Sequence, residues 1–314
     1  MEFFKTATRI DFVGKNRIMV TISAILCAVC LVSMVTRGFN FGIDFAGGTV
    51  VEFQAPEALG PIDEGKVRSA LSGTEYADAS VVRVGPPEDR TFRVSLTKSQ
   101  EENRNLSVDL VKELGAKLGG DVTMRSSESI GPRVGAELRR SALIALTLSW
   151  LAIMLYVWYR FEWKYAPGGV IALVHDVVIT AGMFSIFQWE FDLNVLAALL
   201  VIIGYSINDT IVIYDRIRET VATRGETELD DVVNQALNAT LSRTVLTSGL
   251  TLLVVVSILI LGGPVLRGMA LALLIGMLSG VYSTVYVASA TLLWLGRRYG
   301  RVSAPAERKA RAAT

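Results

Sequence analysis

The sequence predicts a polytopic α-helical membrane protein with six transmembrane helices and one α+β domain between the first two helices. Six long apolar runs predict the helices, and one long polar segment after the first run predicts the domain. Of the 314 residues, 51% are hydrophobic and only 19% are charged. A helix needs roughly 20 apolar residues to cross a hydrocarbon core about 30 Å thick. Runs of this length therefore indicate a chain that crosses a membrane several times.

The apolar runs also divide the chain. They lie at residues 18–36, 141–159, 166–187, 193–214, 244–266 and 268–296. We expect the first run to remain as a helix, because it is longer than a usual signal-peptide core and no small-x-small cleavage pattern follows it. The predicted divisions are an arm at 1–17, the first helix at 18–36, a soluble domain with a connecting helix at 37–140, helices two to six at 141–296 and a basic tail at 297–314.

Lysine and arginine residues in short loops indicate the orientation. They gather in the arm, in the loop after the second run, between the fourth and fifth runs, and in the tail, whereas the short turns on the other side hold only Arg267. We therefore expect both termini in the cytoplasm and the domain at 37–140 on the opposite side. The net charge of +1 does not indicate nucleic acid as a partner.

β-branched residues and turn signals predict the fold of the soluble domain. Strands are expected at 49–53, 79–84, 91–96 and 122–127, and helices at 62–71 and from a capping box of Ser99 and Glu102 to about residue 118. The order βαββαβ is that of a ferredoxin-like domain. The segment opens with Gly42-Ile43-Asp44-Phe45-Ala46-Gly47-Gly48, whose glycines suit a turn.

Two shorter features have structural interpretations. Residues 129–140 lead into the second run, with Pro132 suited to the first turn of a helix; the segment is either a lever that joins the domain to the bundle or an interfacial linker helix. Cys27 and Cys30 have a C-x-x-C spacing but lie in the middle of the first run without other ligands. We interpret them as packing residues rather than as a redox or metal site.

Asp209 is the only formal charge in the run at 193–214. A carboxylate in a spanning helix is a functional hypothesis by default, because hydrocarbon penalises an unpaired ion by several kcal/mol. The simplest use for such a group is carrying a proton. Arg243 lies at the boundary of the fifth run, and since the fourth and fifth runs should be antiparallel, it is expected to approach Asp209. Contact would favour the ionised carboxylate, and separation would favour the protonated one.

His175 and Asp176, in the middle of the third run, are the other candidates for the proton relay, together with Asp209 and Arg243. Structural alternatives stay open for each residue. Asp209 is alternatively a buried carboxylate that Ser206 or another span hydrogen-bonds, and His175 a packing residue that donates to a backbone carbonyl. Asp176 serves either function or assembly, and Arg243 is alternatively an interfacial anchor. The cluster Asp215-Arg216-Ile217-Arg218-Glu219 is expected to be a solvated helix end with ion pairs, and it is also a candidate for passing protons to the cytosol.

Several motifs together resemble the SecF family, the smaller subunits of the SecD–SecF membrane complex that assists bacterial protein export. They run in the family's order over nearly the whole chain. The motifs are Gly42 to Gly48, Ser129-Ile130-Gly131-Pro132-Arg133-Val134-Gly135, His175-Asp176, Gly204-Tyr205-Ser206-Ile207-Asn208-Asp209-Thr210, Asp215 to Glu219, and Ser242-Arg243-Thr244. By motif match, the family's proton-relay aspartate and arginine fall on Asp209 and Arg243.

The resemblance implies a six-span half of a resistance-nodulation-division type transporter, completed by six similar spans of SecD. It implies use of the proton-motive force to promote late steps of preprotein export across the bacterial inner membrane, with the domain in the periplasm. The implied partners are SecD, the Sec channel of SecY, SecE and SecG, YajC and YidC, the unfolded preprotein, and membrane lipid. Ser206, Asn208, Thr210, Asp215 and Arg216 are expected to support the relay, and Gly42, Asp44, Gly47 and Gly48 form the motif after the first helix.

The sequence holds no nucleotide motif, metal cluster or cofactor fingerprint. We therefore expect no cofactor and no enzymatic activity, with energy supplied by a proton or sodium gradient. Three alternatives remain: a half-transporter that exports small molecules or lipids, an intramembrane protease with Ser206 and His175 as its dyad, and a scaffold without ion coupling. The protease would also need an oxyanion hole, which no motif indicates.

Overall fold

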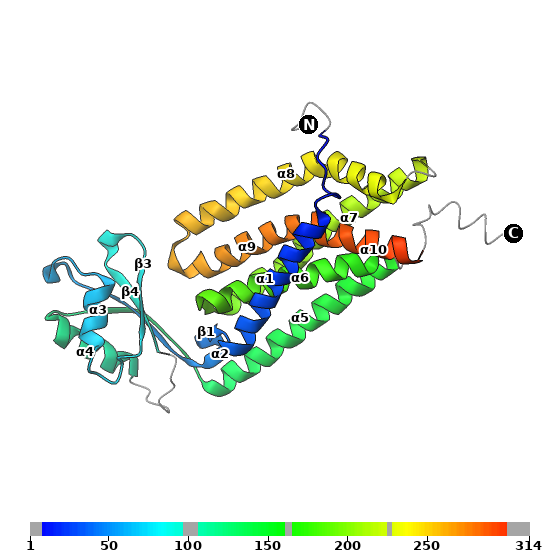
Figure 1. Ribbon diagram of the computed structural model, residues 1–314. Helices are drawn as coiled ribbons and strands as arrows, with labels where there is room; N and C mark the ends of the chain where they lie inside the picture. Colours follow the sequence, from blue (N-terminus) through cyan, green and yellow to red (C-terminus); the bar gives the residue numbers. More distant parts are fainter. Residues whose placement is uncertain (1–7, 97–105, 161–164, 225–227, 300–314) are drawn as a thin grey trace.

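A computed structural model describes residues 8–96, 106–160, 165–224 and 228–299 as a helix bundle with a smaller sheet domain at one end (Figure 1). Within this part of the chain, six helices are long and apolar enough to cross a membrane. They are α1 (Asn16–Thr36), α5 (Pro132–Arg160), α6 (Ala166–Phe187), α7 (Leu193–Arg224), α8 (Leu229–Leu261), and the continuous run of α9 (Gly263–Ser283), the π-helical turn η3 (Thr284–Ala288) and α10 (Ser289–Tyr299). The six predicted crossings are thus present.

Several helix limits differ from the ends of the apolar runs. The fifth helix ends at Leu261 rather than at residue 266, because Gly263 adopts a left-handed φ of 72° and Pro264 sits in the first turn of the next helix. The helices α7 and α8 also continue well beyond their apolar runs. Arg216, Arg218 and Arg243, which the sequence placed in a connection, therefore lie on helices.

The bundle has a central layer and a periphery. In α6, in α7 and in the last span, 56% of the most apolar stretch is buried, against 17% in α1 and α8 and 11% in α5. Small residues bring the helices close. A Cβ on Gly182 of α6 would overlap Cys30 of α1, which is fully buried, and Ser33 and Ser185 share a hydrogen bond of 2.9 Å across the same seam. Both cysteines are free thiols, and Cys30 packs against α6.

The described residues of the sheet domain form four strands in the order β3-β4-β2-β5, and all neighbours are antiparallel. The strands are β2 (Gly48–Gln54), β3 (Ser80–Val84), β4 (Thr91–Leu96) and β5 (Thr123–Ile130), and the helices are α3 (Glu64–Leu71) and α4 (Leu106–Leu118), with short 3-10 turns η1 (Glu57–Leu59) and η2 (Pro87–Asp89). A core of Val51, Phe53, Val67, Phe92 and Leu110 joins the sheet to both helices. These elements coincide with the predicted segments; the capping box of Ser99 and Glu102 lies outside the described residues.

The joint between domain and bundle contains pairings that the sequence did not indicate. The strand β1 (Asn40–Phe41), after α1, pairs in parallel with β6 (Glu190–Phe191), after α6. The glycine motif that follows β1 is not a simple turn but a short helix, α2 (Ile43–Ala46), followed by Gly47 and Gly48 with φ of 76° and 147°. Those φ values favour glycine. The loops after two different spans are thus fastened together at the base of the domain.

The polypeptide enters the second span without a break. Residues 132–140 form the first part of α5, which runs as one helix from Pro132 to Arg160. A Cβ on Gly135, in its first turn, would come within 3.0 Å of Gly47 N and Phe45 O. The connecting segment predicted from sequence is therefore part of the membrane helix and packs on the glycine motif.

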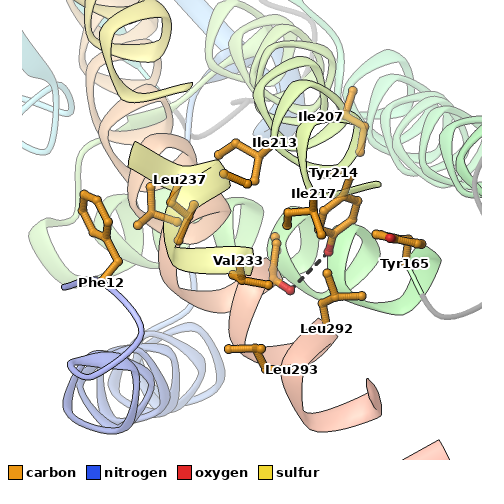
Figure 2. Close-up of a cluster of buried hydrophobic side chains, with 14 of the residues drawn as sticks. Phe12, Tyr165, Ile207, Ile213, Tyr214, Ile217, Val233, Leu237, Leu292 and Leu293 are labelled. Carbon is orange, nitrogen blue, oxygen red and sulfur yellow. Dashed lines mark hydrogen bonds between the residues drawn. The ribbon is translucent and has the colours of Figure 1, made fainter. Parts of the chain in front are cut away.

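The opposite end of the bundle holds a second apolar core (Figure 2). Tyr214 of α7 donates a hydrogen bond of 3.2 Å to the carbonyl of Ala288 in the π-helical turn. Phe12, from the arm before α1, is buried in the same cluster. The arm is tied to α8, because Asn234 Oδ1 accepts from Phe12 N at 2.8 Å and Asn238 Oδ1 accepts from Ile10 N at 2.9 Å.

Candidate functional site

The carboxylate of Asp176 is the most completely bonded polar group inside the bundle. It lies on α6 and is 1% exposed. Ser206 of α7 donates to Oδ2 at 2.6 Å, Ser283 of α9 donates to Oδ2 at 2.8 Å, and Ser279 of α9 donates to Oδ1 at 2.7 Å. The three central helices are therefore joined through one side chain.

His175 lies next to this group, with Nδ1 at 3.1 Å from Asp176 Oδ1 and 3.4 Å from Ser279 Oγ. Its ring stacks on Tyr282 at a centroid distance of 6.1 Å. Tyr282 in turn donates to the carbonyl of Met19 in α1 at 2.7 Å. Nε2 of His175 is buried without a hydrogen-bond partner among the described residues. The histidine thus connects the Asp176 group to the face that α1 covers.

Asp209 has a much sparser environment. It lies on α7, one helical turn from Ser206, and it is 6% exposed. Its hydrogen bond among the described residues comes from Ser248 of α8, whose Oγ donates to Oδ2 at 3.3 Å. Tyr205 donates to the same Ser248 at 3.2 Å. The contact therefore joins a central helix to a peripheral one.

Arg243 does not form an ion pair with Asp209 within the described part of the chain, although both residues face the contact between α7 and α8. Arg243 is exposed and precedes Ser248 by five residues, which corresponds to about 7.5 Å along a helix. The predicted antiparallel arrangement of these helices holds, and the arginine lies toward the end of the bundle away from the domain. A relative movement of α7 and α8 by about one helical turn would change the distance between the Asp209 carboxylate and the Arg243 guanidinium.

The supporting residues fall into two groups. Ser206 and Thr210 are buried, and Thr210 shares a 3.0 Å hydrogen bond with Thr284 of the π-helical turn. Asn208 is instead exposed on α7. On the same face, a Cβ on Gly204 would meet nothing within 4 Å. The central helix therefore presents a polar amide and a small residue outward at membrane depth.

The cluster at the end of α7 is an ion-pair network. Arg216 pairs with Glu219 at 2.6 Å, and Asp215 pairs with Arg218 at 3.5 Å and with Arg160 of α5 at 3.3 Å. These side chains are largely solvent-accessible, so each pair contributes little to stability. The predicted ion-paired helix end is present, with an added contact from α5.

Residues of the glycine motif act at the joint rather than inside the bundle. Asp44 Oδ2 accepts from the backbone N–H of Leu193 at 3.0 Å, in the first turn of α7. Gly42 donates its N–H to the carbonyl of Phe191 at 3.0 Å. The motif thus fixes the start of the helix that carries Asp209.

Sequence reasoning missed the hydroxyl partners Ser248, Ser279 and Ser283, and it did not foresee that Ser206 and His175 both contact Asp176. Ser206 and His175 share no hydrogen bond with each other within the described ranges, so the geometry of a serine–histidine dyad is not formed. A signal was present: serines spaced four apart in an otherwise apolar run favour one helix face. Their target was not predictable, since it is far away in sequence. No group of three histidine, cysteine or acidic side chains that could hold a metal occurs in the described part of the chain.

Known proteins match the parts of the chain that contain most of these residues. A family model described as the C-terminal part of the protein export membrane proteins SecD and SecF matches residues 110–298, and a SecD/SecF GG-motif model matches residues 32–55. The first range contains Asp176, Asp209 and Arg243, and the second contains the glycine motif. Protein translocase subunit SecF of Cereibacter sphaeroides is 40% identical over 92% of this chain and 90% of its own length.

The chain belongs to the SecF family of protein translocase subunits. SecF of Pseudomonas aeruginosa is likewise 40% identical, over 91% of both chains. The crystal structure of SecDF from Thermus thermophilus, a translocon-associated membrane protein, is similar with a TM-score of 0.80 and 36% identity, over 94% of this chain and 40% of that chain. This SecF-family chain thus spans about two fifths of that structure, and with its six apolar helices it is a multi-pass membrane protein.

Proposed function

We propose that this chain is an accessory subunit of the Sec translocase in the bacterial inner membrane, which acts with SecD and uses the proton-motive force to promote late steps of protein export. Membership of the SecF family supports the translocase role. The environment of Asp209 supports the coupling role, and it is the observation on which the proposal depends.

Asp209 is suited to carrying a proton because few hydrogen-bond donors contact its buried carboxylate. One hydroxyl donor at 3.3 Å, from a peripheral helix, leaves most of the carboxylate's acceptor capacity unused. Gaining or losing a proton there disturbs few contacts, and a small movement of α8 changes them. Asp176 accepts from three hydroxyl donors on two neighbouring helices, so a change in its protonation would affect contacts between α6, α7 and α9 at once. We therefore assign the proton to Asp209, with Arg243 as the charge that favours release, and Asp176 and His175 as groups that position α6, α7 and α9.

The energy of a proton gradient is sufficient to bias a movement of the sheet domain. One elementary charge that crosses the membrane contributes about 2.3 kcal/mol per 100 mV. Transfer of several protons per cycle would bias a movement of the sheet domain, which is mounted on α5 and on the β1–β6 pairing. The continuous α5 favours the lever interpretation of residues 132–140 over that of a separate linker helix.

The outward face of α7 supports SecD as the partner. An amide such as that of Asn208 is costly against lipid, and small residues such as Gly204 allow a second helix to approach closely. A spanning helix of SecD on this face would satisfy the amide and would place polar groups beside Asp209. The Sec channel of SecY, SecE and SecG, YajC, YidC and the preprotein are proposed from the family resemblance alone.

Topology and domain class belong to the same proposal. Basic residues at the end of the bundle that carries both chain ends support cytoplasmic termini and a periplasmic domain at 37–140. The strand order β3-β4-β2-β5 in a βαββαβ chain supports a ferredoxin-like class. We also propose that the chain has no enzymatic activity or cofactor of its own and that the ion gradient supplies the energy.

The test is preprotein export into inverted membrane vesicles that contain the Sec channel, SecD and this chain, with and without a proton gradient. Asp209→Asn should abolish the stimulation by the gradient while leaving ATP-driven export intact. Asp109→Asn, which removes an exposed carboxylate from α4 of the sheet domain, is the control and should retain the stimulation. Full stimulation in Asp209→Asn would remove the coupling role and leave a scaffold. Stimulation by a sodium gradient in place of the proton gradient would reassign the ion.

A further inference from the structure

An open cavity of about 650 Å³ lies at the end of the bundle that carries both chain ends. Its walls come from the arm, the first turns of α1, the start of α8 and the end of α10. Hydrogen bonds join the arm to α8. Volumes of roughly 300–1,000 Å³ are usual for small-molecule sites. None of the residues assigned to ion coupling lines this cavity.

The charges in the cavity have both signs. Arg17 and Arg297 line it together with Asp11, Asp230 and Asp231. Two of these groups are already engaged, because Arg297 forms an ion pair with Asp230. Arg17 and Asp231 are exposed and have no partner among the described residues. Asp11 also forms no ion pair among the described residues, and its Oδ1 accepts from the Gly14 N–H at 2.8 Å. One cation and two carboxylates therefore face a ligand that carries both charges.

Asn16 provides an independent indication of a ligand. It lines the cavity and is 9% exposed, yet neither Nδ2 nor Oδ1 has a hydrogen-bond partner among the described residues. A buried polar group without a partner is costly, so native proteins rarely leave one. The amide sits in the first turn of α1, where the backbone N–H of Asn16 already donates to the Val13 carbonyl at 3.1 Å, whereas its side-chain amide is left without a partner in the described part of the chain.

The cavity opens beside the apolar surface of the bundle. Val20, Leu293 and Trp294 form its apolar wall, and Trp294 is 55% exposed with Arg298 over its ring at 5.7 Å. Tryptophan next to arginine is typical of the boundary between hydrocarbon and headgroups. Exposed Ile18 and Ile22 continue along α1 from this point. A molecule with a charged end and an apolar tail fits this arrangement.

We propose that the cavity binds the headgroup of a zwitterionic aminophospholipid of the phosphatidylethanolamine type. The phosphate lies at Arg17, next to Asn16 in the first turn of α1. The ammonium lies at Asp231 and Asp11, and the acyl chains follow the exposed face of α1. Basic pockets at helix ends bind lipid headgroups, but three carboxylates in this one disfavour a purely anionic lipid.

The test is native mass spectrometry of the full-length chain in detergent, titrated with phosphatidylethanolamine, phosphatidylglycerol or glycerophosphoethanolamine. We expect selective retention of phosphatidylethanolamine. Arg17→Gln and Asp231→Asn should each weaken it about tenfold, the loss of one charge-assisted hydrogen bond. Arg267→Gln, an exposed arginine at the opposite end of the bundle, is the matched control and should bind like the wild type. Unchanged melting temperatures would show that the variants remain folded.

Three results would overturn the proposal. Equal binding of phosphatidylglycerol would show a site for any lipid. Equal binding of glycerophosphoethanolamine would show a soluble phosphate–ammonium ligand instead of a lipid. Selective binding that appears only after deletion of 300–314 would assign the cavity to the chain's own tail.

Discussion

The two buried carboxylates of the bundle differ in how many neighbours bind them. Asp176 accepts three serine hydroxyls at 2.6–2.8 Å from two other central helices. Asp209, one helix away, accepts one hydroxyl at 3.3 Å from a peripheral helix. An aspartate side chain is therefore held firmly by its neighbours at position 176, whereas at position 209 it has one weak contact that can change. Burial alone did not distinguish them, since they are 1% and 6% exposed.

The difference follows from the layer in which each carboxylate lies. The helices α6, α7 and α9 pack closely enough for short side chains to meet, as serine must, whereas α8 buries little of its apolar surface against the bundle. Close packing favours many short hydrogen bonds, and loose packing favours one long one. A coupling group is expected in the second setting, because contacts that change during a cycle have to be inexpensive to break.

The largest effect is expected when the central connection is removed. Asp176→Leu leaves the hydroxyls of Ser206, Ser279 and Ser283 without their acceptor. At about 0.6–2 kcal/mol for each of the three hydrogen bonds between membrane helices, the variant should lose about 2–6 kcal/mol of unfolding free energy. Unfolding of the purified chain in detergent, followed by helix content, measures this. Wild-type stability would show that the serine contacts do not hold the helices together.

The serines provide a finer comparison. Ser283→Ala and Ser279→Ala should each cost about 1–2 kcal/mol, and Ser248→Ala, beside Asp209, less than about 1 kcal/mol. The same unfolding measurement ranks the three variants. If Ser248→Ala were the most costly, the contrast between the two carboxylates would be reversed.

Asp209→Asn should separate stability from function. Its amide oxygen can still accept from Ser248, so the unfolding free energy should change by less than about 0.5 kcal/mol. Gradient-dependent export should nevertheless be lost, because an amide does not carry a proton at neutral pH. A variant that loses both stability and export would indicate that Asp209, like Asp176, is a structural group.

Asp192 is a third carboxylate, outside the spans, and it serves as a reference for the other two. Its replacement should have the smallest effect on stability. Burial raises the pKa of Asp192 from its ordinary value of 3.8, opposed by a hydrogen bond from the Val195 N–H, while the nearby Asp44 raises it further. The folded chain then binds more protons than the unfolded chain. This contribution to stability is fully present below about pH 3.8 and is lost as pH rises through the folded pKa.

Asp192→Asn retains an oxygen for the Val195 N–H and removes the titration. Its melting temperature should therefore exceed that of the wild type near neutral pH and converge with it below the ordinary pKa. Melting curves across this pH range measure the difference. Two parallel curves would show that Asp192 does not titrate differently in the folded chain.

Much of the fold could be predicted because it depends on local patterns. Hydropathy over about 20 residues located six spans, and β-branched runs located four strands. The β1–β6 pairing could not be predicted, since two residues in each loop carry no detectable pattern. The extension of α7 and α8 was missed because charged residues end an apolar run without ending a helix.

The candidate site divides in the same way. Asp209, Asp176, His175 and Arg243 were identifiable as charges in apolar runs, which are costly and therefore conspicuous. The relative importance of these residues could not be predicted from the sequence. It depends on Ser279 and Ser283, which follow Asp176 by 103 and 107 residues. Serine is common in apolar helices, so its position alone does not indicate what it contacts.

The tie between the arm and α8 has a consequence for the order of synthesis. Ile10 leaves the ribosome first, but the Asn238 that binds it follows 228 residues later. At about 5–20 residues per second, the arm waits roughly 11–46 s before its partner has been made. During that interval the arm has no partner on α8. Closure of the arm onto α8 is thus a late event in biogenesis, because it cannot precede the synthesis of four of the six membrane helices.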